Sequence, residues 1–458
     1  MNEWNEMKLA FSGKISSLSQ ADARRLFSRG ASSKDATAEI VMEIIENVEK
    51  RGDSAILEYC ERFDGAKMKV GELEVSGREI KEAYGKVAKK TVAALRKSAE
   101  NIRKFAELEK EKNWFAELKG GRIGGKAAKP PSKSGFVGKI VLPLESAGVY
   151  APGGRAAYPS SVLMGVIPGK VAGVGEVIVC SPPDRSGKLN PLILVAADLA
   201  GADKVFKIGG AQAIAAMAFG TKTVPRVGKI VGPGNVFVNA AKKLVAAKGI
   251  VAIDLPAGPS EVLVVADETA KPEWVAADLL AQAEHDENAC AVVVALDREI
   301  AEKVERELEI QLEKLQRKTI AKKSLERNGA ILLARGLEEA VEFANDYAPE
   351  HLELCVEKPV EKLKLVKNAG AVFLGNWSCE AVGDYAAGPN HVLPTGGTAR
   401  AWPGLSVKEF VKETSVEFFS EKDLQKLGKV TEIIARAEGL GGHAQAVARR
   451  MKNRISRE

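Results

Sequence analysis

The sequence predicts an α/β protein in which parallel sheets are covered by helices on both faces. Short apolar runs alternate with helix-length segments over most of the chain, and glycines often stand at their ends. This alternation is typical of crossover units, which join parallel strands through a helix. A hydrophobic content of 45% with 28% charged residues is ordinary for a folded globular chain. The strand-length runs are 176–180, 204–208, 229–231, 261–265, 291–296, 330–333 and 371–374.

Helical periodicity dominates the first quarter of the chain. Residues 36–112 carry apolar side chains at helical spacing, most clearly in 40–48 and 92–95, and predict several helices. The stretch 120–138 is rich in Gly, Lys, Pro and Ser, and we interpret it as a surface loop or linker. Residues 273–286 combine good helix formers with an apolar stripe, so we expect a helix there as well.

Two glycine-rich turns follow predicted strands and lead into predicted helices. They span residues 208–214 and 231–236. Such turns bring backbone amides and a helix amino end close to an anion, such as a pyrophosphate, at the carboxyl edge of a sheet. No GxGxxG motif follows a strand, so the ordinary dinucleotide fingerprint is absent. From the turns alone, nucleotide binding and a purely structural role as chain turns are equally well supported.

Length, cysteine usage and charge narrow the class of protein. A chain of 458 residues should divide into two to four domains. Its five cysteines form no CxxC pair and are expected to be mostly buried, small apolar residues. A net charge of +6 without interleaved aromatic residues favours a solvated surface over nucleic-acid binding. No secretory signal and no apolar run of about 18 residues is present, so we expect a cytoplasmic protein without a membrane partner.

The chain has only four histidines, and each lies in a setting where chemistry could use it. They are His285, His351, His391 and His443, and three of them follow a carboxylate within five residues. Imidazole titrates near neutrality and is the commonest metal ligand in proteins. Any one of these histidines alone is more simply a structural residue, but together they indicate a single site.

A mixed nitrogen and oxygen metal site is the most specific hypothesis that these residues support. Gln282 and His285 are three apart in a predicted helix and therefore share a face. Asp384 and His443 could complete a set that suits zinc, with manganese or cobalt nearly as suitable. Adjacent Glu350 and His351 suit chemistry with two proton transfers at one carbon. The alternative for each pair is an ordinary polar surface.

Eight short motifs lie along the chain, at residues 148–154, 209–214, 232–235, 256–261, 282–285, 346–352, 383–397 and 438–443. Taken in order and at their separations, they closely resemble the histidinol dehydrogenase family. The resemblance extends over residues 35–450 and implies an enzyme that oxidises L-histidinol through L-histidinal to L-histidine with two NAD, the last step of histidine biosynthesis. It also implies zinc, one ion per subunit, and a homodimer with shared active sites.

The resemblance assigns a role to individual residues. Glu350 and His351 would be the catalytic acid/base pair, and Tyr150, Gln212 and Asn235 would line the NAD site. Zinc would be bound by Gln282, His285, Asp384 and His443. The substrate would be contacted by Ser260, Gln282, His285, His351, Asp384, His391, Glu438 and His443.

The resemblance also implies a domain organisation. The fold would contain two incomplete Rossmann-like parallel-sheet domains with an N-terminal helical segment and a C-terminal helical tail. Residues 1–32 would form a helical arm, 33–148 and 262–405 the first Rossmann-like domain with the metal and catalytic residues, and 149–261 the second, NAD-side domain. Residues 406–458 would form the tail that reaches into the partner subunit.

Three other functions compete with this hypothesis. A related dehydrogenase on the same scaffold could act on another polar alcohol, but it should alter the residues that recognise imidazole and amine. A zinc hydrolase could use the metal with Glu350 and His351, yet it leaves the glycine-rich turns unexplained. A non-catalytic binding module would have no need for Glu350 and His351 together.

Overall fold

The first of two parallel sheets is built from six strands. The computed structural model describes residues 9–29, 35–119, 122–153, 157–255 and 258–452. All neighbouring strands of the first sheet are parallel, and the central ones are buried on both faces, which explains their continuous apolar sequences. The strand order is β1 (Phe11–Lys14), β12 (Ala330–Leu333), β11 (Cys290–Ala295), β10 (Glu261–Ala266), β13 (His351–Cys355) and β14 (Ala371–Leu374).

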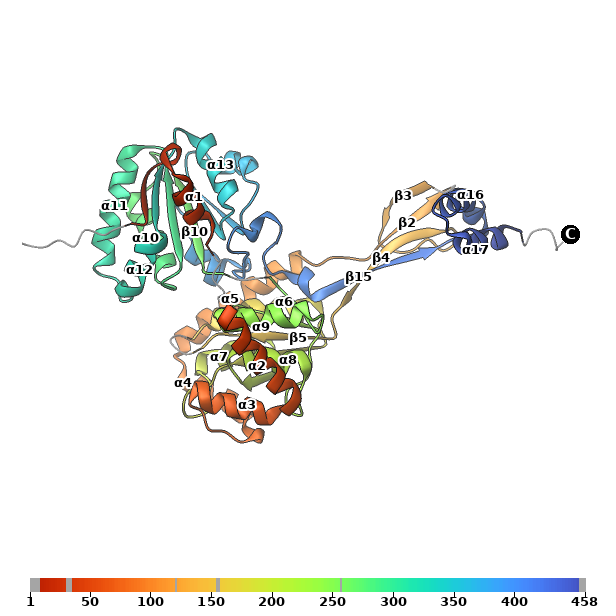
Figure 1. Cartoon of the computed structure of the whole chain (residues 1–458), viewed down its shortest axis with the longest axis horizontal. Helices are drawn as coiled ribbons and strands as arrows, with labels where there is room; N and C mark the ends of the chain where they lie inside the picture. The colour runs from red at the N-terminus through yellow and green to blue at the C-terminus, as the bar shows by residue number, and fades with distance from the viewer. Residues whose placement is uncertain (1–8, 30–34, 120–121, 154–156, 256–257, 453–458) are drawn as a thin grey trace, which may run out of the picture. The chain divides into compact units, whose positions relative to one another are not determined.

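Helices cover both faces of this sheet (Figure 1). Because side chains alternate along a strand, Val262 and Val264 of β10 face one helical layer and Leu263 and Val265 face the other. The first layer consists of α10 (Pro272–Ala283), α11 (Arg298–Leu312) and α12 (Lys318–Asn328). The second consists of α1 (Gln20–Phe27) and α13 (Leu337–Tyr347).

The second sheet has five parallel strands in an order that repeats the plan of the first. The order is β7 (Lys204–Lys207), β6 (Glu176–Ser181), β5 (Ser146–Tyr150), β8 (Lys229–Val231) and β9 (Ala252–Ile253). From β10 in the first sheet and from β5 in the second, the chain builds two strands outward on one side and then returns to build on the other, and β1 is added at the outer edge of the first sheet. This arrangement confirms the predicted α/β class with two Rossmann-like sheets.

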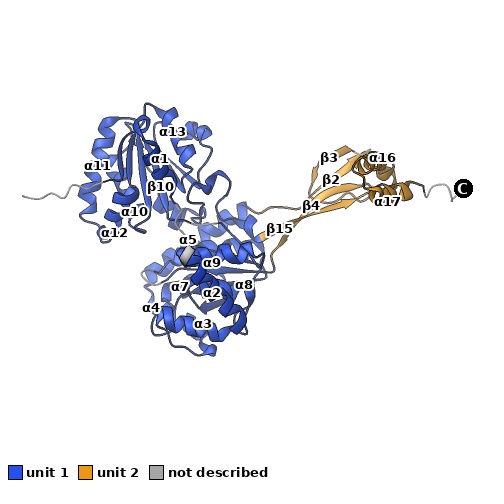
Figure 2. Cartoon of the chain, viewed as in Figure 1, with its two compact units in different colours: residues 1–109, 145–410 blue, residues 110–144, 411–458 orange. Residues whose placement is uncertain are grey.

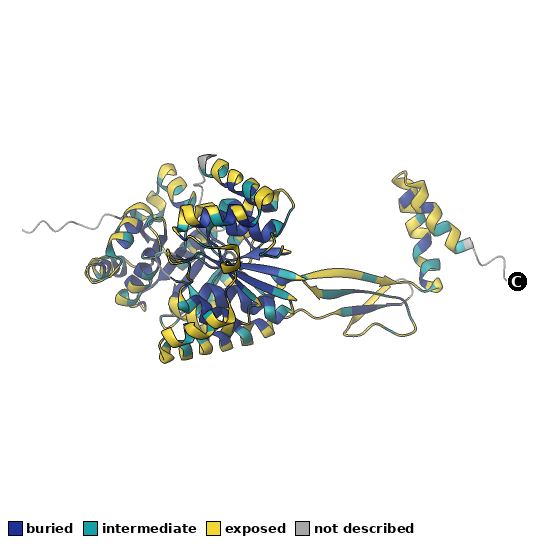
Figure 3. Ribbon diagram, turned by 90° about the horizontal axis from the view of Figure 1, so that it is seen from below, coloured by how far each residue is buried: buried dark blue, intermediate teal, exposed yellow. Residues whose placement is uncertain are grey.

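Helices from two distant parts of the sequence cover the second sheet. One face packs against α2 (Asp35–Arg51), α3 (Asp53–Tyr59), α8 (Gly210–Phe219) and α9 (Val236–Ala247). Helix α6 (Pro159–Ala172) packs on β5 and β6 and also contacts α5 (Lys89–Leu108) and α7 (Pro191–Ala200), while α4 (Gly77–Lys86) packs on α7. In Figure 3 the strands of both large sheets are buried, whereas the outward sides of their helices are exposed.

The expected domain organisation differs from the structure in two places. The helices of residues 35–108 were expected with the first sheet, but apolar residues of α2 and α3 form one core with the second sheet. The apolar face of a helix does not indicate which sheet it will cover, so the sequence could not assign these helices. The N-terminal arm was expected to be helical; its described part contains helix α1, but residues 11–14 form an edge strand of the first sheet.

A smaller compact unit consists of residues 110–144 and 411–458 (Figure 2). Its antiparallel sheet has the order β15 (Val411–Phe418), β4 (Phe136–Pro143), β2 (Trp114–Lys119) and β3 (Arg122–Ala127). The helices α16 (Glu421–Ala437) and α17 (Gly441–Lys452) pack on each other and complete it. The stretch 120–138, expected to be a loop, therefore contributes strands. Strand β4 pairs with β15, which is far away in sequence, so no local pattern indicates this pairing.

None of the helices formed by the described residues combines the length and the apolar character that a transmembrane span requires. The five cysteines are free thiols, and four of them are buried, as expected.

Candidate active site

The predicted catalytic pair lies at the amino edge of the first sheet. His351 is the first residue of β13, Glu350 directly precedes it, and Glu261 is the first residue of the neighbouring parallel strand β10. Helix α10 follows β10 and runs back across the sheet, so that its last turn carries Gln282 to this same edge. The start of two adjacent strands and the end of a crossover helix thus bring these side chains together.

The main chain of Glu261 holds both members of the pair. Its N–H donates to Oε2 of Glu350 over 2.9 Å, and its carbonyl oxygen accepts from Nδ1 of His351 over 3.0 Å. Because Nδ1 carries the proton in this bond, Nε2 of His351 is the nitrogen left to exchange a proton. Nε2 is buried, has no hydrogen-bond partner in the part of the chain that the structure describes, and lies 3.5 Å from Oδ1 of Asp384.

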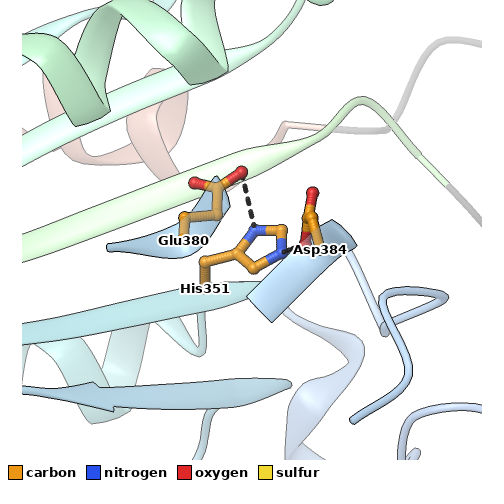
Figure 4. A group of neighbouring side chains, drawn as sticks. All are labelled: His351, Glu380 and Asp384. Carbon is orange, nitrogen blue, oxygen red and sulfur yellow. Dashed lines mark ion pairs between the residues drawn. The ribbon is translucent and has the colours of Figure 1, made fainter. Parts of the chain in front are cut away.

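Two carboxylates that follow β14 complete the surroundings of His351 (Figure 4). Glu380 begins the short helix α15 (Glu380–Val382), and Asp384 lies in the π-helical turn η5 (Gly383–Ala387). Oε1 of Glu380 is 3.8 Å from Nδ1 of His351. One donor atom from each of His351, Glu380 and Asp384 lies within 4.8 Å of the others, which is close enough for a cation to bind them together.

Burial and charge shift the pKa values of these groups in opposite directions. Burial alone would lower the pKa of His351, but the carboxylates of Glu380, Glu350 and Asp384 outweigh it and hold that pKa well above its usual value. Burial raises the pKa of Glu350 to about 8 and that of Glu380 to about 7. Burial would also raise the pKa of Asp384, yet the adjacent imidazole of His351 keeps it below its usual value. The site therefore carries strongly perturbed groups, as catalytic sites often do.

Gln282 and His285 present donor atoms in a way that fits a metal ion. With its nitrogen toward Glu380, the Gln282 amide donates to both carboxylate oxygens over 3.1 and 3.2 Å and to the carbonyl of Glu261 over 3.2 Å. The other amide position, then occupied by oxygen, is 3.4 Å from Nδ1 of His285. Two ligands of tetrahedral zinc, at bond lengths of about 2.0–2.1 Å, would be separated by about 3.4 Å. This pair therefore fits two of the four predicted zinc ligands.

The other predicted substrate and metal residues divide between the two compact units. Nδ1 of His391 donates to the carbonyl of Asp384 over 3.0 Å, so His391 faces the same site. Ser260 directly precedes β10, and its carbonyl accepts from the N–H of Cys290 over 2.9 Å. Glu438 and His443 are exposed residues of the smaller unit, between and within its helices α16 and α17.

The three predicted NAD residues stand at the carboxyl edge of the second sheet. Tyr150 ends β5, and its hydroxyl oxygen accepts the N–H of Gly210 over 3.1 Å. Gln212 is buried in the first turn of α8, and its Oε1 has no hydrogen-bond partner among the described residues. Asn235 caps α9 by accepting from the N–H groups of Phe237 and Val238. Strand order reverses between β5 and β8, and this is where nucleotides bind in open α/β sheets.

Two residues that contribute to the site were not assigned a role from the sequence. Glu380 orients Gln282 and approaches His351, and Glu261 anchors the catalytic pair through its main chain. A signal for Glu380 exists, because it stands four residues before Asp384 and one helical turn places such residues on one face. Glu261 lies in an apolar run that indicates only a buried strand.

Comparison with known proteins agrees with this geometry. The family model described as histidinol dehydrogenase matches residues 27–451. The histidinol dehydrogenase of Geobacter sulfurreducens is 47% identical over 94% of this chain and 97% of its own, and that of Methanosarcina mazei is 47% identical over 97% and 98%.

A solved structure is similar as well. The crystal structure of histidinol dehydrogenase from Elizabethkingia anophelis has a TM-score of 0.89 at 38% identity, covering 97% of this chain and 98% of that one. These similarities confirm the resemblance inferred from the eight motifs. The chain belongs to the histidinol dehydrogenase family, NAD-linked oxidoreductases that act in histidine biosynthesis.

Proposed function

We propose that the chain oxidises L-histidinol through L-histidinal to L-histidine with two NAD and one water, and that Glu350 and His351 divide the proton transfers. The observation that carries this proposal is the joint anchoring of both side chains by the peptide of Glu261, with Nε2 of His351 left free beside Asp384. Each of the two oxidations removes a hydride from the same carbon, and NAD accepts that hydride.

In the first oxidation, Nε2 of His351 takes the hydroxyl proton as the carbinol carbon loses its hydride. The hydrogen bond from Nδ1 to the carbonyl of Glu261 fixes the ring so that Nε2 stays directed at the substrate. The product of this step is the aldehyde. A positioned acid/base group typically contributes about 10²- to 10⁴-fold to the rate.

In the second oxidation, Glu350 takes a proton from the water that adds to the aldehyde, and the resulting hydrate loses the second hydride. Burial raises the pKa of Glu350 to about 8. A carboxylate with such a pKa is a stronger base than an exposed one, which suits proton abstraction from water near neutrality. Loss of the hydride to NAD and of the hydroxyl protons converts the hydrate into the carboxylate of histidine, which is then released.

Zinc, one ion per subunit, would be held by Gln282, His285, Asp384 and His443. The fit rests on the separation of the Gln282 and His285 donors and on the nearby Asp384 carboxylate, whose pKa is held low. When bound, zinc would anchor the imidazole and amine of the substrate and offset the negative charge around His351. The remaining substrate contacts would come from Ser260, His351, His391 and Glu438.

The NAD site would be lined by Tyr150, Gln212 and Asn235 at the strand reversal of the second sheet. The unpartnered Oε1 of Gln212 supports this placement, because a buried amide oxygen without a donor is costly unless a ligand supplies one. The amino end of α9, which Asn235 caps, would favour the negative charge of a pyrophosphate.

A homodimer with shared active sites would complete each site with Glu438 and His443 of the partner's smaller unit. Apolar side chains on α16 support this, since Val430, Ile433 and Ile434 are 56%, 69% and 52% exposed at helical spacing. Such a stripe is characteristic of a helix whose apolar face is covered by another protein surface. As a biosynthetic enzyme that reduces NAD, the protein would work in the cytoplasm.

The deciding experiment is an assay of NADH formation with L-histidinol and with a panel of other amino alcohols. We expect two NADH for each histidine formed and little activity on alcohols without the imidazole. A hydrolase would produce no NADH, and a dehydrogenase for another alcohol would prefer a different member of the panel. Either result would refute the proposal.

A further inference from the structure

The side chain of Arg29 is buried beside the catalytic strands although it comes from the N-terminal arm. It follows helix α1 and is only 4% exposed. Its guanidinium lies over the ring of Tyr347, with 3.3 Å between the central carbon and the ring centroid, and one of its nitrogens donates to the carbonyl of Tyr347. Stacking and hydrogen bonding therefore fix this guanidinium at the end of α13.

The ion-pair partner of Arg29 is Glu261. Nε of Arg29 lies 2.9 Å from Oε1 of Glu261, whose side chain is completely buried. The same oxygen accepts the N–H of Gly396 over 2.6 Å. Burial raises the pKa of Glu261, and Arg29 opposes this shift. A buried carboxylate without its cation would be strongly unfavourable, so removing Arg29 would force Glu261 to move or to take up a proton.

Glu261 is also the residue whose main chain holds Glu350 and His351. Its side chain and its peptide therefore link Arg29 to the catalytic pair through one residue. We propose that Arg29 is a positioning residue, which fixes Glu261 through their buried ion pair and thereby fixes the orientation of Glu350 and His351. This inference rests on the proposed roles of Glu350 and His351 in the two oxidations.

The chain of contacts predicts which kinetic constants depend on Arg29. Among the described residues, its ion pair, hydrogen bonds and ring contact are with Glu261, Tyr347, Ala348 and Leu26, none of which is a proposed zinc or NAD ligand. A displaced acid/base pair slows chemistry, whereas zinc and both substrates keep their binding groups. Arg29 should therefore act on kcat and leave the KM values and zinc content unchanged.

The first test is the Arg29→Met variant of the full-length, zinc-loaded enzyme. We expect kcat for histidinol to fall about 10- to 100-fold, with KM for histidinol and for NAD within about twofold of wild type. Bound zinc, measured by elemental analysis, should stay at the wild-type ratio. Arg29→Lys keeps the charge but not the planar stacking on Tyr347, so it should retain an intermediate kcat.

A double-mutant cycle separates positioning from a general loss of structure. In a His351→Asn background, Arg29→Met should cost much less in kcat than in wild type, because its effect operates through a group already removed. The Arg29→Met/Glu261→Gln variant should recover most of the lost kcat, since it removes the unpaired charge but keeps an acceptor for Gly396 and the peptide at 261.

The control is Lys170→Met, which breaks a partly buried ion pair with Asp203 in the other sheet domain. It should lower the unfolding temperature without changing kcat per folded chain. If Arg29→Met behaves in the same way, or if its effect is fully additive with His351→Asn, the inference is wrong. If Arg29→Met does not fold, Arg29→Lys and the double variant decide by the same criteria.

A failure of the positioning role of Arg29 can be distinguished from a failure of the proposed function. If His351→Asn and Glu350→Gln themselves keep normal turnover, the proposed roles of that pair are wrong. If both are impaired while Arg29→Met has wild-type kcat, only the positioning role of Arg29 is refuted.

Discussion

The amide nitrogen of Gln282 lies 3.1 Å from Oε1 and 3.2 Å from Oε2 of Glu380. This contact directs the nitrogen away from His285 and leaves the amide oxygen on the side of Nδ1 of His285, 3.4 Å away. Amides bind metal ions through oxygen. Glu380 thus selects the orientation in which Gln282 can act as a ligand, and it is a partner of the kind that commonly supports metal ligands.

The Glu380→Ala substitution should therefore weaken zinc binding without removing a proposed ligand. Loss of an orienting partner typically costs about 10- to 100-fold in metal affinity, and we expect an effect of that size. Competition with a chromophoric chelator would measure it. Glu361→Ala in α14 (Pro359–Lys362) is the control, because this exposed residue should leave the affinity unchanged. An unaltered affinity in Glu380→Ala would show that Gln282 needs no such partner.

Removing the metal should abolish activity. We expect a chelator to reduce turnover to background and added zinc or manganese to restore it, since Gln282, His285, Asp384 and His443 form a mixed nitrogen and oxygen set. Metal affinity should also weaken as the pH falls, because protons compete with the ion for the imidazole ligands. Full turnover in a preparation that elemental analysis finds free of metal would contradict this.

Substitution of the catalytic pair should affect the two oxidations unequally. Glu350→Gln should slow oxidation of histidinal more than oxidation of histidinol, because only the aldehyde step needs an activated water. His351→Asn should lower turnover of histidinol with little change in its binding. We expect losses of about 10²- to 10⁴-fold. Steady-state kinetics with each substrate separately measures this, and near-normal turnover of both variants on both substrates would refute the assignment.

Most of the parallel strands were predictable from sequence because burial on both faces makes them continuous apolar runs. Residues 261–265 and 291–296 are such runs, and they correspond to β10 and β11. The strands β1, β5, β9 and β13 were not predicted. The sequence of β13, His351-Leu-Glu-Leu-Cys355, contains two polar residues, and the proposed chemistry of the site uses one of them. A residue kept for such a role weakens the apolar pattern of its strand.

The sequence predicted which residues belong to the candidate site, but it did not predict where in the fold they lie. The motifs predict which side chains take part, and Gln282 and His285 do approach each other as their spacing requires. That the catalytic pair would stand at the amino edge of its sheet depends on how β10 and β13 align, and no local pattern contains this register. The ion pair between Arg29 and Glu261 was not predicted for the same reason, since its members are far apart in sequence.

The Gly232→Ala substitution, which adds a methyl group, should weaken NAD binding. Gly232 follows β8 with φ +110, and an added Cβ would lie 2.2 Å from the carbonyl oxygen of Tyr150. Its N–H and C=O are both held, by Asp254 over 2.8 Å and by the buried Lys242 over 2.9 Å, so the turn cannot simply move aside. Gly232→Ala should raise KM for NAD about tenfold or more and leave zinc content unchanged.

Gly249→Ala is the matched control for this substitution. Gly249 also has a positive φ, +68, but an added Cβ would meet nothing within 4 Å. Both variants carry the backbone strain of an alanine at positive φ, roughly 1–2 kcal/mol, and only Gly232→Ala adds a collision beside Tyr150. Equal KM values for NAD in the two variants would mean that this turn does not border the cofactor.

The last prediction concerns whether His443 acts in its own subunit or in the partner. His443 and Glu438 belong to the smaller unit, whose helix α16 exposes an apolar stripe suited to a second chain. Inactive His351→Ala and His443→Ala chains would be unfolded together and refolded as a random mixture. If sites are shared across a two-fold dimer, half of the dimers are mixed and each mixed dimer rebuilds one intact site of its two.

About one quarter of wild-type activity should then return, by that symmetry count. If each chain supplied its own His443, every site in the mixture would lack one of the two histidines and no activity would appear. Native mass spectrometry of chains with distinguishable tags would establish that mixed dimers are present. Mixed dimers without activity would refute the shared site and leave the family assignment unaffected, because that assignment rests on the whole chain and not on its last helices.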